Sequence, residues 1–237
     1  MSSSQKIEFT KGVIDTIPLI IGAIPFGIIY GTLSQSSDLS MYGALALSSI
    51  VFAGSSQFVA LGLIASGSSI FIIIATTFLI NLRHLLYSFS LRHHLSHLPQ
   101  KWKIPLSFGL TDETFAVTFK HYSDNSSHNL KHWYFLGSFI FFYLNWQICT
   151  ITGIIFGSSF PEIKNWGLEF AMSATFIGIV IPYLKSKPMI VTAIASSTLV
   201  LILKDLPNNL GLIISSIISI SIGVLLELKL LNNNKLK

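Results

Sequence analysis

The sequence predicts an all-α, polytopic membrane helical bundle with six to seven spanning helices and one or two broken or re-entrant helices. Of the 237 residues, 51% are hydrophobic and only 11% are charged, and the mean hydropathy is +0.67. A soluble domain normally has about 25% charged residues, so this chain cannot cover a globule with polar side chains. Eight apolar runs also indicate a membrane protein. They lie at 12–33, 41–66, 70–91, 102–119, 133–157, 167–184, 188–203 and 210–228.

The chain shows no domain boundary and no long linker. Residues 1–11 are polar and mixed in charge, without the basic start, short apolar core and cleavage site of a signal peptide. We therefore expect a cytoplasmic N-terminal segment at 1–11, a single transmembrane domain at 12–230 and a cytoplasmic tail at 231–237.

Two of the apolar runs are interrupted near their middle. A spanning helix needs roughly 20 apolar residues, and the other six runs fit that length reasonably, although 188–203 is short. The run 41–66 contains Gly54-Ser55-Ser56, and the run 102–119 contains Gly109-Leu110-Thr111-Asp112. Ser, Thr and Asp cap helix N-termini, because their side-chain oxygens accept bonds from the first N–H groups. Each run is therefore predicted to form two half-helices that meet at a polar tip.

The basic residues test the topology, because cytoplasmic loops carry an excess of Lys and Arg. If 41–66 enters and leaves on the outer side and 102–119 on the inner side, the chain has six spans and both ends in the cytoplasm. Twelve of the 15 basic residues then lie inside, and only Lys164 and Lys204 lie outside. The alternative keeps 41–66 as a broken but full span, with seven spans and an external N-terminus. Both place the C-terminus in the cytoplasm, and both place the protein in the plasma (inner) membrane.

Arg83 is predicted to lie inside the membrane. It precedes the cytoplasmic end of its run by about eight residues, which is roughly 12 Å at the rise of an α-helix. A charge there needs a partner or must extend its side chain toward the headgroups. The candidate partners are Asp112 and Glu113, which lie at a similar depth if the second polar tip enters from the cytoplasm. Such an ion pair would serve either transport or the anchoring of the hairpin, and the sequence leaves both open.

The other polar tip consists of Gly54, Ser55, Ser56 and Gln57. The N-terminus of a half-helix carries a partial positive charge and binds carboxylates in transporters with broken helices. Gln57 both donates and accepts hydrogen bonds, which suits a zwitterionic ligand. The competing interpretation is that Gly and Ser only allow close helix packing. Asn81 is a further candidate polar residue, expected to face a different side of its helix from Arg83.

The sequence gives little support for a disulfide-linked, metal-binding or nucleic-acid-binding protein. The single cysteine, Cys149, excludes an internal disulfide, and His93, His94 and His97 lack carboxylate or cysteine support for a metal. No metal or cofactor is therefore expected. The net charge of +5 follows from membrane topology and does not indicate nucleic acid. Asp15 is an interfacial or capping carboxylate or, alternatively, a proton carrier.

Four motifs make the chain similar to the AzlC family, the large subunit of branched-chain amino acid exporters. They are Pro25-Phe26-Gly27, Phe52-Ala53-Gly54-Ser55-Ser56-Gln57, Asn81-Leu82-Arg83-His84 and Thr111-Asp112-Glu113-Thr114-Phe115. The resemblance covers about the first half of the chain. It implies export of valine, leucine, isoleucine and related aliphatic amino acids, driven by the membrane potential or a proton gradient. It also implies a small, separately encoded AzlD-like membrane subunit as partner.

These residues are compatible with an aliphatic amino acid as substrate. Phe52, Phe58 and Phe78 are candidates for an apolar pocket. The Gly54–Gln57 tip or Arg83 would bind the carboxylate, and Asp112 or Glu113 would bind the ammonium or carry a proton. The alternatives are a channel-like pore for a small solute and a structural subunit of a transport complex. An enzyme is not expected, since no nucleophile–base pair or metal set is apparent.

Overall fold

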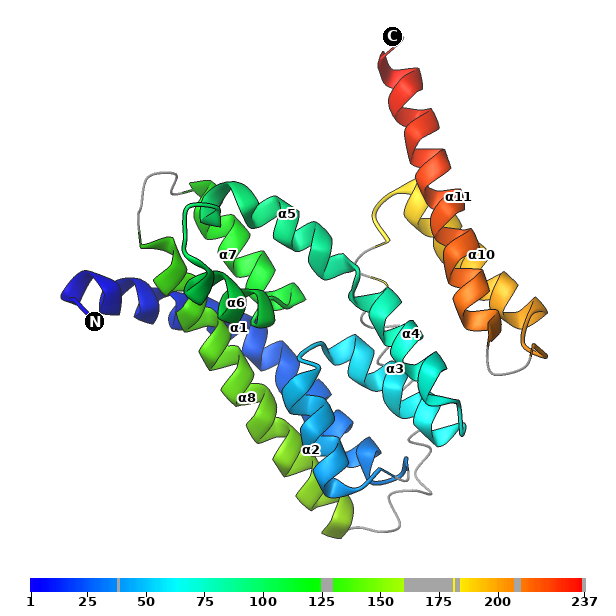
Figure 1. The fold of residues 1–237 in the computed structure, drawn as a ribbon, viewed down its shortest axis with the longest axis horizontal. Helices are drawn as coiled ribbons and strands as arrows, with labels where there is room; N and C mark the ends of the chain where they lie inside the picture. Colours follow the sequence, from blue (N-terminus) through cyan, green and yellow to red (C-terminus); the bar gives the residue numbers. More distant parts are fainter. Residues whose placement is uncertain (38, 125–129, 160–180, 182–183, 207–209, 236–237) are drawn as a thin grey trace.

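The computed structural model describes residues 1–37, 39–124, 130–159, 181, 184–206 and 210–235. In these residues every regular element is a helix (Figure 1). The described part contains four helices long and apolar enough to cross a membrane, Ser3–Ser34, Ile70–Leu95, Lys131–Gly157 and Ile213–Asn232. The prediction of an all-α membrane bundle is confirmed. The predicted run 167–184 lies almost wholly outside the described residues.

The centre of the fold is the contact between α1 (Ser3–Ser34) and α8 (Lys131–Ser159), which lie alongside each other in Figure 1. Gly12, early in α1, faces Tyr134 early in α8, and Gly31, late in α1, faces Thr150. The two helices are therefore parallel. A Cβ atom at either glycine would clash with a backbone carbonyl of α8, so the backbones touch, as is common where small residues meet in membrane bundles.

The run 41–66 forms two helices that double back. α2 (Met41–Ile50) and α3 (Gly54–Ala65) are separated by residues 51–53. Tyr30 of α1 contacts both helices: its hydroxyl donates to the Ala44 carbonyl of α2 at 2.9 Å, and its ring lies edge-on to Phe58 of α3. Phe52, at the break, contacts Phe142 of α8, which is nearer the middle of α8 than the part of α8 beside Tyr30. α3 thus returns toward the end from which α2 enters, as expected of a re-entrant hairpin.

The run 102–119 doubles back from the opposite end of the bundle. α6 (Gln100–Phe108) begins beside Trp133 at the start of α8, and Phe108 at its end packs against Phe139 and Tyr143. α7 (Asp112–Asp124) then returns, so that the His121 ring stacks on Tyr134 at 3.7 Å. Both predicted interruptions are therefore real breaks, at Gly54 and just before Asp112.

The run 70–91 contains a break that the sequence analysis did not predict. Within the span Ile70–Leu95, Leu82 keeps a helical backbone conformation but separates α4 (Ile70–Asn81) from α5 (Arg83–Leu95). This local change of direction brings Asn81 and Arg83 toward the same neighbour, the first turn of α3. The expectation that they face different sides was wrong, because it assumed an unbroken helix.

The chain ends in two further helices, α10 (Lys187–Ile202) and α11 (Leu210–Lys235). They pack on each other as a hairpin, and α11 also contacts α4 (Figure 1). In Figure 1 these two helices lie away from the two helix breaks.

Candidate functional site

The two helix breaks meet at the middle of the α1–α8 pair. The rings of Phe52 and Phe108, which lie next to the two breaks, stack with centroids 6.1 Å apart. The first turns of α3 and α7 begin at this point. Ala53, the N-cap residue of α3, has no side chain to cap it, so α3 offers its first N–H groups to another acceptor.

The first turn of α7 is capped and acidic. The Thr111 hydroxyl accepts from the Thr114 N–H at 3.3 Å, and the Thr114 hydroxyl accepts from the Thr111 N–H at 2.8 Å. This reciprocal arrangement corresponds to a capping box. Asp112 and Glu113 follow directly, where the helix dipole favours negative charge.

Arg83 connects the two breaks. Its Nη1 lies 2.8 Å from Asp112 Oδ2, and its Nη2 donates to Ser55 Oγ at 2.6 Å. The predicted ion pair therefore forms with Asp112, one of the two expected candidates. Tyr87 donates its hydroxyl to the other oxygen of Asp112 at 2.5 Å. Arg83 Nε is buried and has no hydrogen-bond partner among the described residues, so this donor of the guanidinium remains free to bind a ligand.

Hydrogen bonds from Gln57 and Ser56 stabilise the break between α2 and α3. Gln57 is fully buried; its Nε2 donates to the Val51 carbonyl at 2.6 Å, and its Oε1 accepts from Trp146 Nε1 at 3.1 Å. Ser56, also fully buried, donates to Asn81 Oδ1 at 2.6 Å. The expectation that Gln57 serves a zwitterionic ligand is not supported by this geometry, because both ends of its amide are already bonded within the protein.

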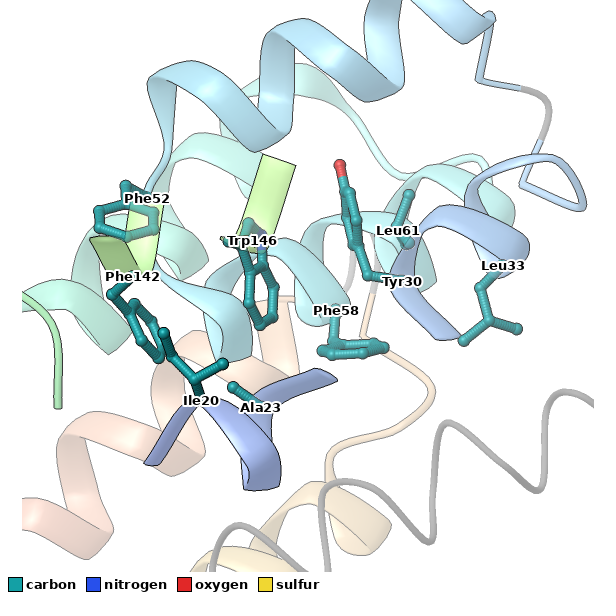
Figure 2. Packing of buried hydrophobic residues seen from close by; sticks show 9 residues of the cluster. All are labelled: Ile20, Ala23, Tyr30, Leu33, Phe52, Phe58, Leu61, Phe142 and Trp146. Carbon is teal, nitrogen blue, oxygen red and sulfur yellow. The ribbon is translucent and has the colours of Figure 1, made fainter. Parts of the chain in front are cut away.

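A cavity of about 400 Å³ lies at the meeting point of the breaks. This volume is within the usual range for small-molecule sites. One part of its wall is polar and comes from Ser55, Arg83, Thr111, Asp112 and Glu113. The rest is apolar and includes Leu19, Ala23, Phe26, Phe52, Phe58, Phe142 and Trp146. Figure 2 shows Phe52, Phe58, Phe142 and Trp146 converging with Ala23 of α1.

The predicted site residues divide into two groups around this cavity. Gly54, Ser55, Arg83, Asp112 and Glu113 line it, whereas Ser56, Gln57 and Asn81 are not among its lining residues and support its wall from behind. Phe52 and Phe58 also line it as expected. Phe78 does not, since its side chain is 65% exposed on α4.

Several lining or supporting residues were missed by the sequence analysis. Trp146 and Phe142 of α8 form part of the apolar wall, and Tyr87 supports Asp112. A signal was available for Trp146, because a tryptophan within a spanning helix needs a bonding partner for its indole N–H. Asp15 accepts from the Tyr134 hydroxyl at 2.8 Å and is not among the residues that line the cavity. The described residues contain no group of three or more metal-ligating side chains.

Comparison with known proteins places these features in a family. The family described as AzlC protein matches residues 18–160, which contain both breaks and all of the described residues that line the cavity. The inner membrane protein YgaZ of Escherichia coli is 30% identical over 184 residues, 76% of this chain and 74% of that protein. An uncharacterized membrane protein of Archaeoglobus fulgidus is 33% identical over 78% of this chain and 80% of its own length.

A third relative has a name that states a transport role. The branched-chain amino acid transport protein AzlC of Bacillus subtilis is 32% identical over 70% of this chain and 64% of its own length. No solved structure matches the chain. The family match and these relatives agree with the fold and with the motifs at the two breaks, and the chain belongs to the AzlC family of membrane proteins.

Proposed function

We propose that this protein is the large subunit of a secondary transporter that exports branched-chain and related aliphatic amino acids across the cytoplasmic membrane. The family and the name of the Bacillus relative support a role in transport. The observation that carries the proposal is the cavity between the two breaks, which is charged in one part and aromatic in the other. An aliphatic amino acid has the same division, with a charged backbone and an apolar side chain.

The substrate carboxylate would bind near Arg83 and the start of α3. Arg83 has a buried Nε donor left over, and the first N–H groups of α3 are not capped by Ala53. Cationic side chains and helix N-termini are the usual partners of carboxylates. These groups lie in the same cavity wall, next to Ser55.

The ammonium would bind Glu113. Asp112 already accepts from Arg83 and Tyr87, whereas Glu113 lines the cavity without an ion pair to a basic side chain of the described chain. The branched side chain would then lie among Phe52, Phe58 and Trp146. Burial of such a side chain contributes roughly 1.5–3 kcal/mol, which favours aliphatic over polar amino acids.

The test is efflux of labelled leucine, isoleucine, valine and methionine from cells loaded with dipeptides. The chain is expressed alone and together with the small membrane subunit that we expect as its partner. Efflux above the empty-vector level for at least one branched-chain amino acid is expected. If none of the four is exported with both subunits in the membrane, the proposed substrate class is wrong.

The efflux assay tests the channel alternative, and a binding assay tests the structural-subunit alternative. A transporter gives saturable efflux that collapses with the ion gradients, whereas a channel gives passive flux that does not saturate. A purely structural subunit predicts that this chain does not bind substrate at all. Saturable binding of leucine by the purified chain would exclude that role.

A further inference from the structure

A second pocket, of about 470 Å³, opens on the side of the bundle between α5, α6 and α8. We call it the lateral pocket. It shares no lining residue with the cavity at the helix breaks. Its inner wall is formed by Leu91, Leu106, Leu110 and Phe135, all of which are buried.

The mouth of the lateral pocket is basic. Arg92, in the last turn of α5, and Lys103, in the first half of α6, both line it, together with Ser96. Lys103 Nζ donates to the Ser96 carbonyl at 2.8 Å, which leaves two of the three ammonium donors. The described lining residues include no carboxylate, so the two positive charges are not neutralised within this wall.

The apolar part of the pocket extends away from these cations along two helices. On α5, Phe89 and Leu85 precede Arg92 and are 65% and 54% exposed, and Leu85 lies roughly 10 Å from Arg92 along the axis. On α6, Leu106 follows Lys103 by one turn, and Leu110 comes after the end of the helix. The pocket is therefore basic at one end and mainly apolar elsewhere, with Ser88 and Ser107 as further polar lining residues.

We propose that the lateral pocket binds an anionic phospholipid of the cytoplasmic leaflet. The phosphate would bind Arg92 and Lys103, and an acyl chain would lie along Phe89 and Leu85 against the buried leucines. The cations belong to the end of the bundle that also carries Lys101 and Lys120, which the positive charges place in the cytoplasm. Basic pockets between membrane helices on that side bind anionic headgroups. The exposed apolar groove below the cations favours a lipid over a soluble anion or an acidic peptide.

The test is lipid binding to the purified full-length chain in detergent, measured by native mass spectrometry with phosphatidylglycerol and phosphatidylcholine as probes. The wild type is expected to retain phosphatidylglycerol selectively. Each cation contributes roughly fivefold to binding an anionic headgroup, so Arg92→Gln/Lys103→Gln should weaken phosphatidylglycerol binding roughly 30-fold. Arg92→Lys/Lys103→Arg keeps both charges and should retain it.

The matched control is Lys101→Gln/Lys120→Gln, which removes the same charge from two exposed residues outside the pocket. Its binding should match the wild type. Equal losses in the control and pocket variants would show general surface attraction and overturn the site. So would unchanged binding in Arg92→Gln/Lys103→Gln, or displacement of the lipid by inorganic phosphate or an acidic peptide at equal concentration. None of these readouts depends on amino acid transport.

Discussion

Arg83 is the residue through which the two helix breaks are joined. One guanidinium nitrogen bonds to Asp112 at the start of α7 and another to Ser55 at the start of α3. Arginine suits this role because its planar fork presents several donors in fixed directions, which lysine does not. The ion pair was predictable from the sequence, since the depths of Arg83 and Asp112 agree and a buried charge needs a partner.

The first prediction concerns this pair. Arg83→Ala leaves Asp112 without its cation, which costs up to about 3–5 kcal/mol for a fully buried pair. The loss should be smaller here, because the two side chains keep 24% and 18% of their surface exposed. The thermal midpoint in detergent should fall, and efflux should be lost.

The charge-swapped variant Arg83→Asp/Asp112→Arg separates the two possible roles of the pair. It should recover much of the thermal midpoint without recovering transport, because the cation then lies on α7, away from Ser55. Recovery of both would show that the pair only anchors the hairpin.

The hydrogen bonds of Gln57 could not be predicted from the sequence. Its bonding partners are a carbonyl six residues earlier and an indole on α8, 89 residues later. No local pattern predicts that distant contact, so the sequence left open whether this tip binds a ligand or only allows close helix packing. In the structure Gln57 has a stabilising role, which the thermal stability of a Trp146 variant can measure.

Trp146→Phe should destabilise the protein by about 1–3 kcal/mol, because Gln57 Oε1 loses its donor while remaining buried. Trp133→Phe is the matched control, since Trp133 Nε1 has no hydrogen-bond partner among the described residues. Thermal unfolding of the two variants in the same detergent gives the comparison. Equal shifts would mean that the indole bond to Gln57 contributes nothing beyond ring packing.

At the scale of helices, the sequence predicted two of the three breaks that interrupt apolar runs in the described part of the chain. Gly54-Ser55-Ser56 and Gly109-Leu110-Thr111 carry the small and capping residues that begin a new helix, and both runs break there. The break at Leu82 has no such signal, because leucine is a good helix former. The only local hint was the polar pair Asn81 and Arg83, which both bond to the first turn of α3.

The α1–α8 contact gives the third prediction. Gly31→Ala places a Cβ against the Thr150 carbonyl and the backbone of Gly153, so the helices must separate. Overpacking of this kind costs roughly 1–3 kcal/mol. Gly22→Ala is the control on the same helix, because a Cβ there meets no atom within 4 Å. The yield of monodisperse protein should fall for Gly31→Ala only; an equal fall for both would contradict the close contact.

At the scale of the whole molecule, the parallel arrangement of α1 and α8 bears on topology. Two parallel spans must be separated by an odd number of membrane crossings. The six-span arrangement places one crossing between them, at 70–91, whereas the seven-span alternative places two. The doubling back of α2–α3 supports six spans as well, whereas the doubling back of α6–α7 is common to both arrangements. Charge counting alone hardly separated the two, because they differ only in the location of Lys6 and Lys11.

The fourth prediction follows from this topology. Cys149 is the single cysteine, so Cys149→Ser gives a background for placing new ones. In intact cells a membrane-impermeant thiol reagent should label Ser66→Cys, between α3 and α4, and should leave Ser3→Cys and Gln100→Cys unlabelled. Labelling of Ser3→Cys from outside would favour the seven-span alternative.

The most direct test of the central claim is saturable binding of labelled leucine to the purified chain. The cavity between the two breaks is the proposed substrate site. Ala116→Leu, on the cavity wall, should therefore weaken leucine binding, while Ala65→Leu, an exposed alanine at the end of α3, should not. Equal binding by the wild type and both variants would contradict the account and place the substrate elsewhere.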